Sequence, residues 1–192
     1  MSESNQTINF YSVSEAYGEF SNFAGFPIEL DGKRWPTSEH YFQAQKFKET
    51  SHQAEIRKEP SPMRAARMGR ERKRPLRKDW ESVKDAIMRQ AVLAKFTQHA
   101  ELRELLLSTG ESRLVEHTTN DAYWGDGGDG SGKNRLGQIL MEIRRTLREA
   151  GDTEGEAKRG SGEVDVLGWN PIGQPDLIRC HKEFKPGLRH LS

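Results

Sequence analysis

An apolar stripe with a helical period is the feature that most constrains what this chain can fold into. Large aliphatic side chains recur every three or four positions after Asn134, at Leu136, Ile139, Leu140, Ile143 and Leu147. A stripe of this kind is the buried face of an amphipathic helix and needs other elements to cover it. A second stripe with similar spacing follows Asp79, at Trp80, Val83, Ile87, Ala91 and Ala94. The sequence therefore predicts two main helices with buried faces.

The other predicted elements are short. TINFYSV near the N-terminus and RLVEHT before the glycine-rich region have the composition of strands. The dipeptide Asp31-Gly32 predicts a two-residue hairpin between FPIEL and KRW. Thr37 or Ser38 can cap a helix predicted over SEHYFQAQKFKE, and further helical pieces are expected at SHQAEIRKE and AELRELLLSTG.

Composition limits the class of protein. The chain has 192 residues, 33% apolar and 31% charged, with a net charge of +1, so no global field directs it to nucleic acid or a membrane. Cys180 is the single cysteine, which fits a reducing compartment. MSESNQTINF lacks the pattern of a signal peptide, and no apolar run approaches the roughly 20 residues of a membrane span. We expect a cytoplasmic protein without membrane contact.

The sequence changes character after residue 150. We expect one folded domain over residues 1–150. Residues 151–163 contain no large apolar side chain and are predicted to be a flexible linker. Residues 164–192 regain apolar side chains but contain three prolines, and they are predicted to be an irregular C-terminal extension.

Three polar residues share one face of the helix predicted after Thr37. Glu39, Gln43 and Lys46 are separated by four and three positions. In a pocket, a buried carboxyl group has a raised pKa and can donate a proton near neutral pH, and a desolvated lysine can attack an aldehyde-like carbon to form a Schiff base. On spacing alone, the alternative is an ordinary solvated stripe.

A glycine-rich segment, NDAYWGDGGDGSGKN, precedes the last predicted helix. Glycine backbone N–H groups and a helix start can approach an anion, and Trp124 can stack on a base or sugar. The segment is neither a Walker loop nor a Rossmann turn, and Asp126 and Asp129 oppose a phosphate cradle. These acids suggest a metal loop, but no glutamate stands at the closing position of an EF-hand. The alternative is a flexible connection.

The segment from Arg57 to Lys78 is strongly basic, with ten Lys or Arg residues against two Glu and a local charge of +8. Such a run can hold the phosphates of a nucleotide or polynucleotide, with Arg70 as the best single candidate, or it can be a solvated basic face. The histidines show no metal-ligand spacing. Cys180-His181 invites a thiol–imidazole pairing, but adjacent side chains rarely point at one another, and we expect no catalysis there.

Several blocks occur together in one order. They are Ser-Asn-Phe at 21–23, EHYFQAQKF at 39–47, Trp-Gly at 124–125 and Asn-x-Leu-Gly at 134–137. With the intervening AARMGR and VLAKF segments, this order resembles the NADAR family, also called YbiA-like, over about residues 8–148. The resemblance implies a compact, helix-rich α+β single domain with a small β component.

The resemblance also implies N-glycosidase activity, with Glu39, Lys46 and Asp121 as catalytic residues. Glu39 is expected to assist proton transfer, Lys46 to capture the opened sugar as an imine or to stabilise charge, and Asp121 to orient a sugar hydroxyl, a water or Lys46. The residues expected to bind the substrate around them are Asn22, Trp35, Gln43, Arg70, Trp124, Gly125 and Asn134. No metal or other cofactor is expected, because C–N cleavage needs only proton transfer and a stabilised oxocarbenium-like carbon.

Two substrate classes are associated with the family. One is ADP-ribose attached to guanine, in DNA or in a nucleoside, and the other is the phosphoribosylamino-pyrimidine intermediates of riboflavin synthesis. The basic run at 57–78 favours the first class. The sequence leaves two other readings open: a non-catalytic module that binds ADP-ribose or nucleic acid, and a structural adaptor that docks through its last 30 residues.

Overall fold

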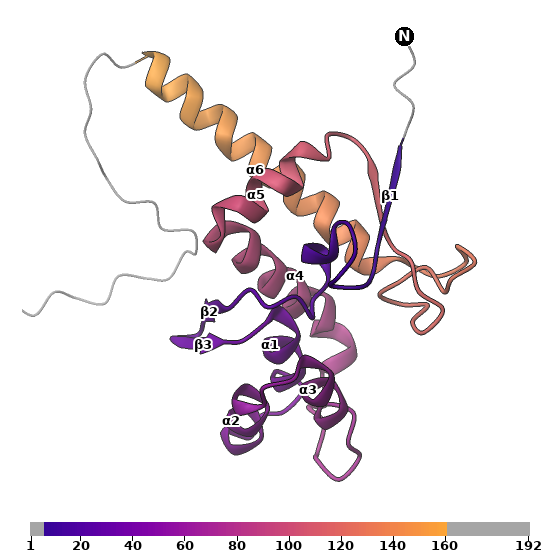
Figure 1. The fold of residues 1–192 in the computed structure, drawn as a ribbon. Helices are drawn as coiled ribbons and strands as arrows, with labels where there is room; N and C mark the ends of the chain where they lie inside the picture. The colour runs from indigo at the N-terminus through magenta and orange to yellow at the C-terminus, as the bar shows by residue number, and fades with distance from the viewer. Residues whose placement is uncertain (1–5, 161–192) are drawn as a thin grey trace, which may run out of the picture.

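The structure, a computed structural model, describes residues 6–160 (Figure 1). The strands are β1 (Thr7–Phe10), β2 (Ile28–Leu30), β3 (Lys33–Trp35) and β4 (Arg113–Glu116). The helices are the 3-10 turn η1 (Gly18–Phe20) and α1 (Ser38–Ala44), α2 (Thr50–Lys58), α3 (Pro62–Met68), α4 (Trp80–Gln98), α5 (Ala100–Ser108) and α6 (Arg135–Gly160). The architecture is the expected helix-rich α+β domain with a small β component. The predicted extension at 164–192, with Cys180 and His181, lies outside the described residues.

Helix α4 lies at the centre of the molecule, where α1, α5 and α6 contact it, and α2 and α3 pack against α1 (Figure 1). The whole predicted stripe of α6 is buried, from Leu136 at 0% exposure to Leu147 at 5%. Fully burying one such side chain contributes roughly 1.5–3 kcal/mol. The stripe is therefore sufficient to hold α6 against α4 and β4, as its period predicted.

Helix α6 continues beyond the end of its apolar stripe. It reaches Gly160, so the segment 151–160, which composition predicted as part of a flexible linker, is helical. Residues 161–163 of that predicted linker lie outside the described part of the chain. Helical hydrogen bonding can propagate past a packed segment, because each added residue makes one more bond to a helix that is already nucleated. Among residues 6–160, no helix is both long and apolar enough to cross a bilayer.

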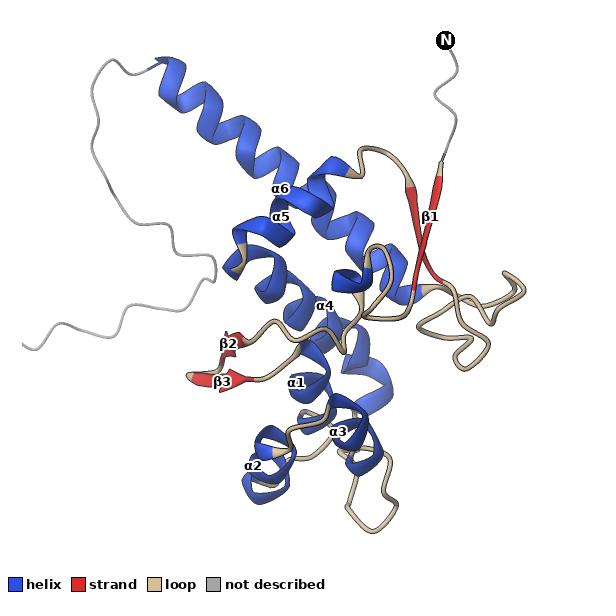
Figure 2. Ribbon diagram, viewed as in Figure 1, coloured by secondary structure: helices blue, strands red, loops and turns tan. Residues whose placement is uncertain are grey.

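The β component consists of two separate pairs of strands (Figure 2). Strands β2 and β3 form the predicted hairpin, in which Asp31 and Gly32 both have positive φ, 54° and 67°, as a two-residue turn requires. Strands β1 and β4 pair in parallel, with Ile8 opposite Leu114 and Phe10 opposite Glu116. Because the two strands are parallel, the segments that follow them leave the same edge.

Helix α1 begins where the sequence predicts. The Thr37 hydroxyl accepts a hydrogen bond from the His40 N–H at 3.3 Å, which caps the helix. All seven residues of α1 are buried, and the helix ends at Ala44, earlier than predicted. Lys46 therefore stands just after the helix, although its N–H still bonds to the Gln43 carbonyl in a final turn. The outcome is a polar helix end enclosed by the domain instead of a solvated stripe.

Asn134 fastens the start of α6 to β4. Its side-chain amide accepts from the Glu116 N–H at 2.9 Å and donates to the Leu114 carbonyl at 2.8 Å. Its φ of 50° is left-handed, a conformation that asparagine tolerates better than most residues. A side chain at Gly137 would come within 2.2 Å of the Leu114 oxygen, so glycine is required for this close approach. Asn134 thus fixes the end of β4.

We expect Asn134→Ala to lower the free energy of unfolding by roughly 2–4 kcal/mol, because it removes two buried hydrogen bonds and strains the left-handed backbone. Asn134→Gly is the matched control, since it removes the same bonds but relieves the strain, and should cost less than alanine. Denaturant unfolding monitored by circular dichroism measures both. Wild-type stability in the alanine variant would contradict this role for the amide.

Candidate functional site

One cavity of about 800 Å³ gathers most of the predicted site residues. It opens where the segments after β1 and β4 leave their shared edge. Residues 11–13 form one wall and residues 116–124 another, and the remaining walls come from residues 21–23, α1, the start of α3, Arg70 and part of α4. The predicted residues that line it are Asn22, Glu39, Gln43, Lys46, Arg70, Asp121 and Trp124. All three predicted catalytic residues therefore face one cavity.

Glu39 is a buried acid at the first turn of α1, with 6% exposure. One carboxylate oxygen accepts a 2.7 Å hydrogen bond from Gln43 Nε2, one turn along the same helix. Burial raises the pKa of Glu39, while the Gln43 bond and the charges of Lys46 and Arg70 oppose that rise. Desolvation is the larger effect, so this carboxyl holds its proton more tightly than an exposed glutamate.

Lys46 lies over an aromatic floor. Its Nζ is 5.6 Å from the centre of the Phe42 ring and 5.5 Å from that of Trp80. Burial lowers the pKa of Lys46, and the neighbouring Glu39 charge acts in the opposite direction. A lowered pKa increases the fraction of neutral amine, which is the nucleophilic form. Trp124 extends the floor with its ring edge-on to Phe42 at 5.3 Å.

Asp121 serves a structural purpose as well as facing the cavity. Its Oδ1 accepts from the Tyr123 N–H at 2.7 Å and from the Trp124 N–H at 2.8 Å, so the carboxylate holds the turn that carries Trp124. Its charge also reaches the two glutamates of the cavity, since it raises the pKa of Glu39 and of Glu116. Asp121 is thus placed close to both other acids of the cavity.

Glu116 is a cavity residue that the sequence analysis missed. It is the last residue of β4, its Oε2 is covered from solvent, and that atom has no hydrogen-bond partner within residues 6–160. Burial raises the pKa of Glu116 to about 8, with the charges of Asp121, Glu39 and Asp126 adding to the effect. The available signal was an acidic residue within the predicted strand RLVEHT, just before the segment that contains Asp121.

Gly69 makes room for the amide that supports Glu39. A Cβ on Gly69 would lie 1.9 Å from Gln43 Oε1 and 2.8 Å from its Cδ, so only glycine allows Gln43 to reach its observed position. Arg70 follows directly, is exposed, and lines the cavity. The chain thus brings a guanidinium to the cavity immediately after the close contact that orients the amide.

Three predicted substrate-binding residues do not line the cavity. Trp35 is 1% exposed in a second core cluster, where its Nε1 donates to the Leu30 carbonyl at 3.1 Å and its ring meets Tyr41 edge-on. Gly125 is buried against the Glu116 carbonyl, which would lie 2.8 Å from an added Cβ. Asn134 forms the bridge described above. The family resemblance predicted substrate contacts for these three residues, whereas packing and hydrogen bonds give them structural roles here.

The basic run contributes to the cavity mainly through Arg70. Other members are paired with nearby acids: Arg64 with Glu59, Arg74 with Glu55 and Glu71, and Arg77 with Asp79. Pairing at an exposed surface is weak and leaves the positive field largely in place for a polyanion. The structure therefore places one basic side chain at the cavity and several beside it.

The glycine-rich loop is organised by a carboxylate. Asp126 accepts from the Thr118 N–H at 3.1 Å, the Gly128 N–H at 2.9 Å and the His117 ring at 2.8 Å. These contacts lower the pKa of Asp126 against the opposing effect of burial. Within residues 6–160, no group of three or more His, Cys, Asp or Glu side chains is placed to hold a metal ion. The loop acts as an ordered connection that holds the cavity wall.

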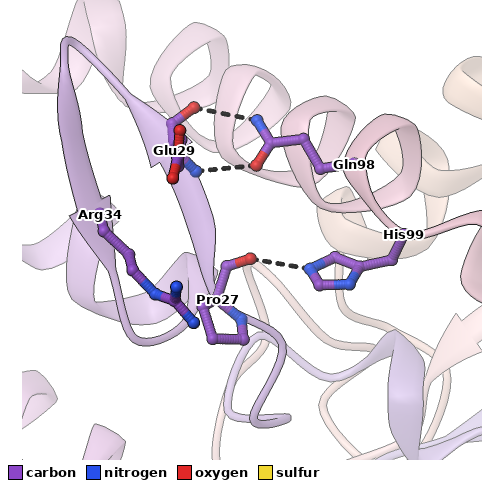
Figure 3. A pocket seen from close by; sticks show the side chains of 5 residues that line it. All are labelled: Pro27, Glu29, Arg34, Gln98 and His99. Atoms are coloured by element: carbon purple, nitrogen blue, oxygen red, sulfur yellow. Dashed lines mark hydrogen bonds between the residues drawn. The ribbon is translucent and has the colours of Figure 1, made fainter.

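A second, more open cavity of about 590 Å³ lies beside the β2–β3 hairpin (Figure 3). Its polar side chains are engaged in holding the hairpin to the end of α4. Gln98 bonds the Glu29 N–H at 2.8 Å and carbonyl at 2.9 Å, and the His99 ring bonds the Pro27 carbonyl at 2.7 Å. It has no paired acid and amine of the kind that Glu39 and Lys46 form, so the larger cavity is the candidate active site.

Fold and cavity together define a class of protein, a compact α+β domain that encloses acid, amine and aromatic groups in one pocket. The NADAR domain model matches residues 9–148. The chain belongs to the NADAR family, which confirms the resemblance drawn from its motifs.

Named relatives fall into two groups. The chain is 68% identical over 140 residues to N-glycosidase YbiA of Escherichia coli, covering 73% of this chain and 88% of that protein. An NMR structure of E. coli YbiA matches with a TM-score of 0.72 and 65% identity, over 77% of this chain and 88% of that one. Riboflavin biosynthesis protein VVA0006 of Vibrio vulnificus is 43% identical over 144 residues, covering 75% of this chain and 39% of that protein.

We expect Glu116→Gln to stabilise the protein at alkaline pH. Because the folded-state pKa is about 8 against an ordinary 4.5, Glu116 binds a proton in the folded protein that it loses in the unfolded chain between these pH values. Its contribution to stability is therefore complete below pH 4.5 and declines up to pH 8, by at most about 1.4 kcal/mol per pH unit.

Glutamine mimics the neutral acid and cannot lose a proton. The free energy of unfolding of the variant should therefore increase relative to that of the wild type as pH rises from 5 to 8. Denaturant unfolding at several pH values measures the difference. Glu104→Gln, an exposed change on α5, is the matched control and should show no such trend. A difference between Glu116→Gln and wild type that stays constant with pH would contradict the raised pKa.

Proposed function

We propose that this N-glycosidase removes ADP-ribose from guanine in nucleic acid, or in a nucleoside, and acts in the cytoplasm. Action on N-glycosyl bonds is supported by the 68% identity to an N-glycosidase. The choice of substrate is the proposed part. The single observation that carries the chemistry is the shared cavity, where an acid with a raised pKa and an amine with a lowered pKa lie together over aromatic rings.

In the proposed reaction, the bond between the anomeric carbon and the base nitrogen breaks, and its electron pair leaves with the base. Glu39 assists the proton transfers that accompany this cleavage. The carbon passes through an oxocarbenium-like state, which Asp121 stabilises by its charge or by orienting a sugar hydroxyl. Water then adds to the carbon. The aromatic walls keep bulk water out and strengthen these interactions.

Lys46 has two candidate roles. As a neutral amine it can attack the aldehyde carbon of the opened sugar, release water and form an imine, which a second water hydrolyses to free the sugar. As an ammonium it can stabilise negative charge on the substrate. Burial lowers the pKa of Lys46 and supports the first role, because desolvation favours the neutral form. The Trp80 ring 5.5 Å from Nζ supports the second role, because the face of an aromatic ring attracts a cation.

The surroundings of the cavity support the proposed substrate class. Arg70 at the cavity and the basic segment around it suit a diphosphate or a polynucleotide better than a single phosphate. Trp124 offers a ring on which a base can stack or against which the sugar can lie. A cavity of about 800 Å³ is within the range of sites that enclose ligands of nucleotide size.

A second candidate is hydrolysis of phosphoribosylamino-pyrimidines. The relative named as a riboflavin biosynthesis protein favours it, at 43% identity. The acid and amine groups of the cavity suit the cleavage of either substrate, since both substrates contain ribose bonded to nitrogen. The two candidates differ in the number of phosphates that Arg70 and its neighbours must hold.

We expect the wild type to release ADP-ribose from ADP-ribosylated guanine DNA faster than it cleaves a phosphoribosylamino-pyrimidine, with Glu39→Gln lowering turnover by roughly 10²–10⁴. Chromatographic detection of the free base and sugar, side by side on the two substrates, measures this. The inverse preference would favour the riboflavin intermediates. A melting-temperature shift with ADP-ribose but no product from any member of the panel would identify a non-catalytic binding module.

If Lys46 forms an imine, borohydride should reduce it during turnover and leave the sugar on the protein. Mass spectrometry of proteolytic fragments should then find the adduct on Lys46, and Lys46→Arg should abolish it while keeping the charge. An active enzyme that yields no adduct would assign Lys46 to charge stabilisation.

A further inference from the structure

The cavity contains three carboxyl groups, whereas the proposed reaction needs one of them as the source of the proton for the departing base. Glu39, Glu116 and Asp121 all line it. We propose that Glu116 is the catalytic acid that protonates the leaving base, and that Glu39 and Lys46 act on the sugar. This inference rests on the proposed N-glycosidase function and assigns a residue to one of its steps.

The backbone of Glu116 is rigidly held. Phe10 lies opposite Glu116 in the β1–β4 pair. The Glu116 N–H donates to Asn134 Oδ1 at 2.9 Å, and the Glu116 carbonyl accepts from the Asp126 N–H at 3.0 Å. A third contact comes from Gly125, which packs against the same carbonyl. These contacts fix the point from which the Glu116 side chain reaches into the cavity, so less reorganisation is needed during the reaction.

The side chain of Glu116 is polar but unsatisfied. Oε2 is covered from solvent and has no hydrogen-bond partner in the described part of the chain. Two other residues that line the same cavity have an atom in the same condition, Asn22 Oδ1 and Gln43 Oε1. Buried polar atoms without a partner cost roughly 1–3 kcal/mol each, so three of them at one cavity indicate atoms that a ligand engages.

The charges around Glu116 favour its protonated form. Glu39 faces it from α1, and Asp121 and Asp126 face it from the following loop, and all three raise its pKa in addition to burial. The cations of the cavity are engaged elsewhere: Lys46 and Arg70 act on Glu39, and Lys84 of α4 bonds Glu81. Glu39 therefore has cationic neighbours and a Gln43 donor that favour ionisation, whereas Glu116 has anions.

The proton balance is complete. As the C–N bond breaks, the bonding electrons go to the base nitrogen, and the Glu116 carboxyl gives that nitrogen its proton and becomes a carboxylate. Water supplies a hydroxyl to the anomeric carbon, and the proton of that water restores the Glu116 acid. The net change is hydrolysis, with the protein returned to its starting state.

The test is a set of pH–rate profiles on the substrate that the wild type cleaves. The wild type should lose kcat/KM as pH rises through about 8, because Glu116 loses its proton there. Glu116→Gln should reduce kcat by roughly 10²–10⁴, and its residual activity should lack this alkaline fall. Glu116→Asp should keep more activity together with an alkaline fall, and Glu104→Gln should behave as the wild type.

The leaving group gives an independent readout. In a substrate with the same sugar phosphate and a pyridinium leaving group, that group departs as a neutral pyridine and needs no proton. Glu116→Gln should therefore lose far less activity on this substrate than on the one whose base must be protonated as it leaves. A purely structural residue would lower both activities equally, which would overturn the proposal. So would an alkaline fall retained in Glu116→Gln. If the wild type cleaves no N-ribosyl substrate at all, the proposed function itself fails.

Discussion

Desolvation of ionisable groups inside one cavity is the constraint on which this structure depends. Burying a charged carboxylate or ammonium costs several kcal/mol unless it is paired, so such groups move toward their neutral forms. The pKa values of Glu39 and Glu116 rise and that of Lys46 falls, each with burial as its largest cause. A neutral carboxyl group can donate a proton, and a neutral amine can attack carbon. The same burial that costs stability supplies the chemistry.

The fold maintains this enclosure with few elements. The parallel pair β1–β4 directs two chain segments to one edge, and α1 places Glu39 and Gln43 on the facing side. Close approaches complete the walls, since Gly69 lies against Gln43 and Gly125 against the end of β4. Lys95 adds a further restraint. Its buried amine donates to the Glu19 and Ser21 carbonyls and holds the loop that carries Asn22.

Periodicity and turn chemistry predicted much of the fold. The α6 stripe, the Asp31-Gly32 hairpin and the Thr37 cap all depend on local geometry, and all were found where the sequence indicated. The helical extension over 151–160 was missed because its composition carries no packing signal. The parallel pairing of β1 with β4 joins segments about a hundred residues apart, which a local pattern does not reveal.

The family motifs predicted the site correctly where their residues line the cavity, and incorrectly where those residues lie in the core. Glu39, Lys46 and Asp121 converge, although α1 ends before Lys46 and the helical spacing used to relate them is incomplete. Trp35 was expected at the site from the family resemblance, but its ring completes the core beneath the hairpin. Glu116 was missed because one acid at the end of a short strand looks like any edge residue until the tertiary fold encloses it.

The central claim is that one cavity holds the reacting carbon among these groups. A crystal structure of the Glu39→Gln variant with uncleaved ADP-ribosylated guanine nucleotide tests it most directly. The account predicts the anomeric carbon between Lys46 and Asp121, the base nitrogen toward Glu116 and the phosphates at Arg70. A sugar bound beside Arg34 in the cavity of Figure 3, or along the basic segment with no atom near Lys46, would contradict it.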